Sequence, residues 1–239
     1  MIIWKSFGAT VRGPGHIATG KPNQDAWASF HRTWGDGVVV SDGLGSKPFS
    51  NWGSHAACFA VKCAVRACSS QTTIDLDHLF DSIKTQWLYH IAPLDPHDCA
   101  ATCLFAFRLR DGAIQIGMLG DGLASALKSD GSVVSLEEDK SQGFSNITTA
   151  LSAKVTAKDW RHLSVAEDDF TAVVLCTDGV ADDLDDSDGF VKGFAEEYCA
   201  LAALSASRRA RGILENWPTP KHSDDKTIAC LCREDVPDA

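Results

Sequence analysis

The chain has 239 residues and a formal net charge of −10, with 44% hydrophobic and 23% charged residues. This length and composition are typical of an ordinary globular protein, and we expect residues 1–239 to form a single domain. The acidic balance argues against a nucleic-acid partner, because such a partner requires a basic surface. No apolar run approaches the length of a membrane span, and no secretory signal is recognisable. We therefore expect a cytoplasmic protein with no membrane partner, whose nine cysteines are reduced.

Alternating and helical patterns predict strands and helices in separate blocks. In the first half of the chain, strand-like runs occur at residues 2–11, 25–32 and 37–41. Helical patterns follow at residues 51–69 and 74–91. Residues 99–136 indicate three or four strands joined by hairpins. After a polar loop, the pattern predicts a strand at 170–177, helices at about 188–203 and 205–215, and a last strand at 226–232. Blocks of this kind favour the α+β class, with antiparallel sheet carrying helices on its outer faces.

Aspartates recur at the ends of these predicted strands. They stand in "VVVSDG" (Asp42), "GMLGDG" (Asp121), "VVLCTDG" (Asp178), "PNQDAW" (Asp25) and "HSDDKTIACL" (Asp224 and Asp225). Any one of these is ordinarily a turn residue. Three apolar strands that each run into Asp-Gly indicate more, because Mg²⁺ and Mn²⁺ prefer oxygen ligands and glycine lets the backbone approach closely. The pattern predicts a divalent metal site with more than one ion.

The order of five motifs resembles the metal-dependent protein phosphatases of type 2C. These motifs are "NQDAW", "VVVSDGLGS", "GMLGDGLAS", "LCTDGVADDL" and "SDDKTIACL", and together they cover nearly the whole chain. The resemblance implies a four-layer α-β-β-α sandwich, in which two antiparallel sheets are flanked by helix pairs and hold a two-metal centre at one edge. It also implies a phosphoserine/phosphothreonine hydrolase that acts on a phosphorylated protein and opposes a Ser/Thr kinase.

The resemblance assigns metal ligands by motif. Asp42 would bridge two Mn²⁺ or Mg²⁺ ions, with the carbonyl of Gly43 as a further ligand. Asp25 would bind the second ion, and Asp178 and Asp224 would complete the first. Asp225 stands where the family usually has asparagine.

A third, more weakly held ion is implied at Asp121, with Asp182 as a possible helper.

Two cations roughly 3.5–4 Å apart share a water and lower its pKa, so that it attacks phosphorus in line without a phosphoenzyme. Catalysis would then depend on Asp42 and Asp178 as ligands, and no serine or cysteine nucleophile is expected.

Two departures from the family pattern concern the general acid and the phosphate ligand. Leu44 stands where eukaryotic members carry a histidine, and the usual arginine before the Asn-Gln-Asp segment is missing. His16, Lys21 and Arg12 are the candidates to bind phosphate, and each can equally be an ordinary solvated charge. His16, in a predicted loop between glycines, is the strongest of the three and the candidate catalytic side chain.

Other functions remain alternatives at this stage. A pseudophosphatase would keep the scaffold as a binding module without turnover, and a third possibility is a hydrolase of small phosphoesters. The presence of Asp25, Asp42, Asp178 and Asp224 together favours the active enzyme. A nucleotide P-loop is disfavoured, because "GHIATGKP" places Pro22 where a Ser or Thr would bind Mg²⁺.

Overall fold

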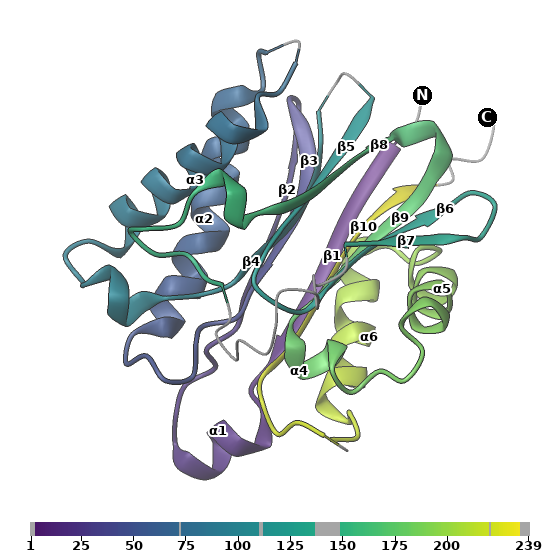
Figure 1. Cartoon of the computed structure of the whole chain (residues 1–239). Coiled ribbons are helices and arrows are strands. Elements are labelled where there is room, and N and C mark those ends of the chain that lie inside the picture. Colours follow the sequence, from purple (N-terminus) through teal and green to yellow (C-terminus); the bar gives the residue numbers. More distant parts are fainter. Residues whose placement is uncertain (1–2, 72, 110–111, 137–148, 220, 235–239) are drawn as a thin grey trace.

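A computed structural model describes residues 3–71, 73–109, 112–136, 149–219 and 221–234. These residues form four layers, in which two sheets face each other and helices cover both outer faces (Figure 1). The chain is therefore an α+β sandwich of the expected α-β-β-α type. Among the described residues, no helix is both long and apolar enough to cross a membrane.

Each sheet contains five antiparallel strands. The first sheet has the order β1-β10-β9-β6-β7, with β1 Ile3–Val11, β10 Lys226–Glu234, β9 Phe170–Cys176, β6 Leu123–Lys128 and β7 Val133–Ser135. The second has the order β2-β3-β4-β5-β8, with β2 Ala26–Arg32, β3 Gly35–Ser41, β4 Cys103–Arg108, β5 Ala113–Leu119 and β8 Arg161–Ala166. Central strands are apolar on both faces because each sheet is covered on both sides.

Helix pairs cover the outer faces of the two sheets. Helices α2 Ser50–Cys68 and α3 Leu76–Ile91 pack on the β2–β8 sheet, and α5 Ser187–Tyr198 and α6 Ala203–Glu215 pack on the β1–β7 sheet (Figure 1). A third apolar cluster, which includes Trp4, Val38 and Leu231, fills the space between the sheets. Three cores of this kind make the sheets a rigid support for the loops at their edges.

The expected strands and helices are present, with four differences. The polar segment before residue 170 contains the edge strand β8, which was expected to be loop because its exposed positions are polar. Residues Pro14–Thr19 form the short helix α1 where a loop was expected, and α4 Asp178–Ala181 follows β9. Finally, β5 and β6 do not form a hairpin, because they belong to different sheets.

Candidate metal centre

Asp42 lies directly after β3, where a neighbouring strand fixes its backbone. Its amide donates to Thr102 Oγ1 at 2.9 Å, and its carbonyl accepts from the Thr102 amide at 2.7 Å. The preceding Ser41 is buried and donates to the Thr102 carbonyl at 2.5 Å. A Cβ on Gly43 would lie 2.5 Å from the Ser50 carbonyl oxygen, so the start of α2 requires glycine there. These contacts explain why a buried strand ends in Asp-Gly.

Asp25 precedes β2 and is almost fully buried. Its Oδ2 accepts a 2.8 Å hydrogen bond from Thr177 Oγ1, at the end of β9 in the opposite sheet. Thr177 Oγ1 in turn accepts from the Thr227 amide of β10 at 3.1 Å. A carboxylate from one sheet is thereby held by a threonine hydroxyl of the other, and a backbone amide of β10 orients that hydroxyl.

Asp178 is the first residue of α4, immediately after β9 and Thr177. The next residue must be glycine, because a Cβ on Gly179 would lie 2.0 Å from the Asp225 carbonyl oxygen. The β9–α4 junction is therefore pressed against the segment that enters β10. This contact brings Asp178 towards Asp224, and the charge of Asp224 raises the pKa of Asp178.

Two adjacent aspartates before β10 have different surroundings. The Asp224 side chain is 40% exposed, whereas the Asp225 side chain is 1% exposed. Asp225 accepts from the amides of Gly13 at 2.7 Å and Gln24 at 2.6 Å, and its Oδ2 lies 2.8 Å from His16 Nδ1. Asp225 therefore ties α1 and the Asp25 loop together, and it leaves Asp224 to face the site.

Burial and mutual repulsion raise the pKa values of three of these carboxyls. Burial raises the pKa of Asp25 to about 7, although hydrogen bonds from Asp42, Thr227 and Thr177 oppose the rise. Burial also raises the pKa of Asp42 well above its usual range, and the charges of Asp25 and Asp178 raise it further. For Asp178 the value is about 6, because of burial and then the charges of Asp121 and Asp224. Like charges this close favour protonation unless a cation is present.

A buried basic side chain, Lys226, interacts electrostatically with the aspartates of this cluster. Lys226 is buried, and its Nζ donates to the backbone carbonyls of His222 at 3.3 Å and Asp224 at 3.1 Å. Burial lowers the pKa of Lys226, and the charges of the surrounding aspartates oppose that shift. Four carboxylates with hard oxygen donors fit the requirements of Mg²⁺ or Mn²⁺.

The residues expected at a third ion lie beside the same cluster. The charges of Asp121 and Asp182 both raise the pKa of Asp178, so all three share one electrostatic environment. Asp121 stands between Gly120 and Gly122, which have φ angles of 101° and 113°. Asp182 Oδ2 lies 3.2 Å from His222 Nε2.

The three candidate phosphate ligands are placed differently. Lys21 and Arg12 are exposed or partly exposed, and both donate to backbone carbonyls, of Gly45 at 3.3 Å and of Lys21 at 3.2 Å respectively. His16 is held against Asp225, and its Nδ1 also lies 3.7 Å from Asp224 Oδ1. The ligand atoms of His16, Asp224 and Asp225 lie within 4.8 Å of one another, which is close enough to hold an ion.

A polar hollow of about 270 Å³ adjoins Asp224. It is lined by Gly15, His16, Lys221, His222, Ser223 and Asp224. Lys221 and His222 were not among the sequence candidates, although "KHSDD" places them directly before the predicted ligand Asp224. Lys21 and Arg12 do not line this hollow.

Comparisons with known proteins agree with this architecture. The family model described as "Protein phosphatase 2C" matches residues 12–215. The photosystem II phosphatase PBCP is similar in structure, with 15% identity, a TM-score of 0.70, and coverage of 98% of this chain and 100% of that chain. A bacterial serine phosphatase matches with 17% identity and a TM-score of 0.67 over 100% of both chains. RsbX in complex with magnesium matches with 14% identity and a TM-score of 0.62, over 98% of this chain and 100% of that one. In a search of curated proteins, nothing matches this chain.

Proposed function

This chain belongs to the protein phosphatase 2C family, and we propose that it is a divalent-metal-dependent phosphoserine/phosphothreonine protein phosphatase. Membership of the family supports a hydrolase of phosphoric esters. Our proposal goes beyond family membership in two respects: the substrate is a phosphorylated protein, and the attacking water is activated by metal. The observation that carries them is the group of four carboxylates, Asp25, Asp42, Asp178 and Asp224, whose charges act on one another at one edge of the two sheets.

The four carboxylates have the chemistry of a two-ion centre. Asp42 is central, because the charges of Asp25, Asp178 and Asp224 all raise its pKa. Asp42, Asp25, Asp178 and Asp224 are the residues that would hold the ions, with Asp42 as the shared ligand. Bound Mg²⁺ or Mn²⁺ supplies an activated water and neutralises charge that develops on the phosphoryl oxygens. The magnesium in the similar RsbX structure supports this choice of metal.

The polar hollow is the proposed entry site for the phosphoryl group. Asp225 holds His16 through Nδ1, which fixes the ring and leaves Nε2 for a ligand. Lys221 and His222 line the same hollow and can donate to a phosphate oxygen. We therefore retain His16 as the phosphate-binding and candidate proton-donating residue, and we add Lys221 and His222 to it.

The hollow is small and polar, and it opens to solvent beside Asp224. A site of this form suits a phosphorylated side chain on an extended segment, whose peptide remains outside. A nucleotide or a sugar phosphate would bury more of its own surface in a pocket. A similar fold occurs in a structure of the bacterial stressosome, a system that controls secondary-messenger signalling, which supports a signalling protein as partner.

The experiment is a metal-depletion assay on the full chain. After chelation, we expect no hydrolysis of p-nitrophenyl phosphate or of a phosphothreonine peptide, and recovery with Mn²⁺ or Mg²⁺. The phosphopeptide should be a better substrate than sugar phosphates and nucleotides at equal concentration. Full activity in excess EDTA would overturn the metal dependence. Binding of the phosphopeptide without turnover in any metal would identify a pseudophosphatase, and preference for a small phosphoester would overturn the protein substrate.

A further inference from the structure

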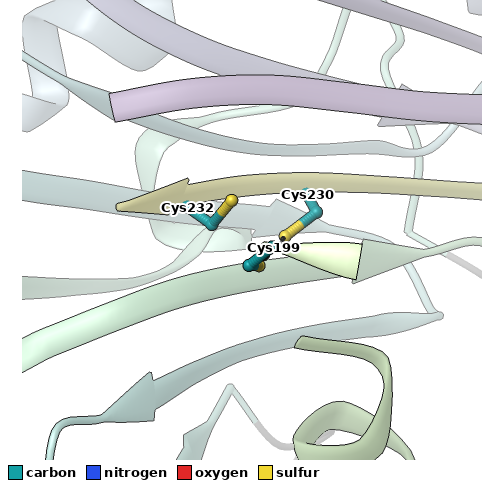
Figure 2. A group of neighbouring side chains, drawn as sticks. All are labelled: Cys199, Cys230 and Cys232. Atoms are coloured by element: carbon teal, nitrogen blue, oxygen red, sulfur yellow. Dashed lines mark hydrogen bonds between the residues drawn. The ribbon is translucent and has the colours of Figure 1, made fainter. Parts of the chain in front are cut away.

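Three cysteines converge on the outer face of the β1–β7 sheet. Cys230 and Cys232 are buried on β10 and point to the same face, because Leu231 between them points to the other. Cys199 directly follows α5 and lies against the same strand (Figure 2). The three Sγ atoms lie within 4.8 Å of one another, and those of Cys199 and Cys230 are 3.9 Å apart.

We propose that Cys199, Cys230 and Cys232 form a binding site for a thiophilic d¹⁰ cation, with Zn²⁺ and Cu⁺ as its biological forms. A metal–sulfur bond of about 2.3 Å places two sulfur ligands roughly 3.8–4.0 Å apart in tetrahedral or trigonal coordination. The Cys199–Cys230 distance already has this value. Small side-chain rotations would bring the remaining sulfur into the same range. Thiolates select these soft cations over Mg²⁺ and Mn²⁺.

The apolar surroundings mean that thiolates at this site would need a bound cation to offset their charge. Cys230 and Cys232 lie among apolar side chains between the sheet and helices α5 and α6, where isolated thiolates would be costly. A metal ion would supply the missing positive charge as each thiol releases its proton to solvent. The hydrogen bond with Cys199 and burial raise the pKa of Cys232, and the charge of Lys5, its directly opposite partner in the β1–β10 ladder, partly opposes that rise. Lys5 would offset part of the negative charge that three thiolates leave on the complex.

The cysteine site is separate from the aspartate centre in place and in chemistry. Cys230 is five residues beyond Asp225 along β10, a distance of roughly 17 Å at the usual rise per residue. An ion there would join the end of α5 to the central strand whose other end carries Asp224. Because one site offers sulfur and the other oxygen, ions at the two sites would not compete.

The test is a titration of the reduced, oxygen-free full chain with Cd²⁺ or Zn²⁺ in excess Mg²⁺, which keeps hard-oxygen sites occupied. We expect one tightly bound ion per chain, an ultraviolet sulfur-to-cadmium charge-transfer band, and a higher melting temperature. Cys199→Ser should weaken this binding at least 100-fold and remove most of the band. Cys199 is the partly exposed member of the cluster, so this variant should fold.

Cys63→Ser is the matched control, since Cys63 is also partly exposed, and within the described part of the chain its sulfur has His90 Nε2, at 4.0 Å, as its polar neighbour. Cys63→Ser should leave the affinity for Cd²⁺ or Zn²⁺ and the sulfur-to-cadmium charge-transfer band unchanged. Equal loss in both variants, or unchanged binding in Cys199→Ser, would overturn the site. The site would also be overturned if the reduced chain bound no metal and, on oxidation, only formed a disulfide at Cys199. Mass spectrometry detects that disulfide. A parallel competition with a Cu⁺ chelator decides between copper and zinc.

Discussion

One aspartate lies near the start of strand β3 and another directly follows its end, and the charges around the two have opposite signs. Asp36, near its start, meets two basic side chains. Its Oδ1 forms a short contact with His31 Nδ1, and its Oδ2 lies 3.6 Å from the guanidinium of Arg108. Asp42, directly past the end of β3, meets the carboxylates of Asp25 and Asp178 instead.

Burial raises the pKa of both aspartates, but the neighbours then act in opposite directions. His31 and Arg108 lower the pKa of Asp36, whereas Asp25 and Asp178 raise the pKa of Asp42 further. At the Asp36 end the protein supplies its own counter-charges. At the Asp42 end the charges that act on Asp42 are those of further carboxylates, and this is the arrangement expected where external cations bind.

The Asp36 end also has a clear structural role. Arg108 of β4 pairs with Glu167, which accepts from Trp4 Nε1 of β1 at 3.2 Å. Because β4 and β1 belong to different sheets, this network fastens the two sheets together. Charge at one end of the sandwich therefore serves the fold, and charge at the other end is available for chemistry.

The largest effect should come from removing the central charge of the proposed centre. Asp42→Asn keeps the shape of the side chain but removes a ligand that both ions would share. We expect phosphatase activity to fall by several orders of magnitude while the circular dichroism spectrum stays native. Metal-free stability should be unchanged or higher, because the substitution removes repulsion with Asp25 and Asp178.

Asp36→Asn on the same strand is the matched control. It should lower the free energy of unfolding by about 1–3 kcal/mol, because a buried charge-assisted contact is lost. Turnover per folded molecule should stay unchanged. An active Asp42→Asn enzyme would mean that the centre has been assigned to the wrong loop.

This contrast shows what the sequence could and could not predict. Asp42, Asp121 and Asp178 could be proposed as ligands because apolar strands run into Asp-Gly. The α+β class followed from the strand and helix blocks, and the four-layer order followed from the resemblance to the phosphatase family. The role of Asp225 was not identifiable, since its partners Gly13, Gln24 and His16 lie about 200 residues earlier in the chain. The pairing of Asp36 with Arg108 depends equally on a register between strands that local pattern does not fix.

The next largest effect should come from the fastening network. Arg108→Met removes the positive charge shared by Asp36 and Glu167, and it leaves both carboxylates without that partner. We expect a loss of about 2–4 kcal/mol in the free energy of unfolding, measured by urea denaturation. Metal affinity should stay within a few-fold of the parent protein. A large loss of metal binding in a folded Arg108→Met protein would contradict the separation of the two ends.

The pH dependence of stability should reveal the uncompensated charges directly. The folded-state pKa values of Asp25, about 7, and Asp178, about 6, exceed the unfolded value of about 4. A raised pKa contributes stability that is present below pH 4 and is lost as the pH rises through 6 to 7. The metal-free protein should therefore lose stability between pH 5 and 8.

Saturating Mg²⁺ should flatten this dependence, because the cation replaces the protons. Asp25→Asn should flatten the metal-free curve by removing the group with the higher of the two stated pKa values. Urea denaturation at several pH values, in EDTA and in Mg²⁺, measures both effects. Parallel curves with and without Mg²⁺ would show that no cation binds among these carboxylates.

The smallest effect should come from the periphery of the centre. The charge of Asp121 raises the pKa of Asp178, so Asp121 is close enough to affect an ion held there, but it would belong to the third, weaker site. A site with fewer carboxylates binds hard cations more weakly. Asp121→Ala should therefore leave two ions bound. It should reduce the turnover of a phosphoprotein substrate, with a smaller loss in the affinity for the phosphate ester. Asp178→Ala should abolish metal binding at the core. Calorimetric titration with Mn²⁺ compares the two variants. If Asp121 serves only the turn between Gly120 and Gly122, Asp121→Ala will lower stability and leave turnover per folded molecule unchanged.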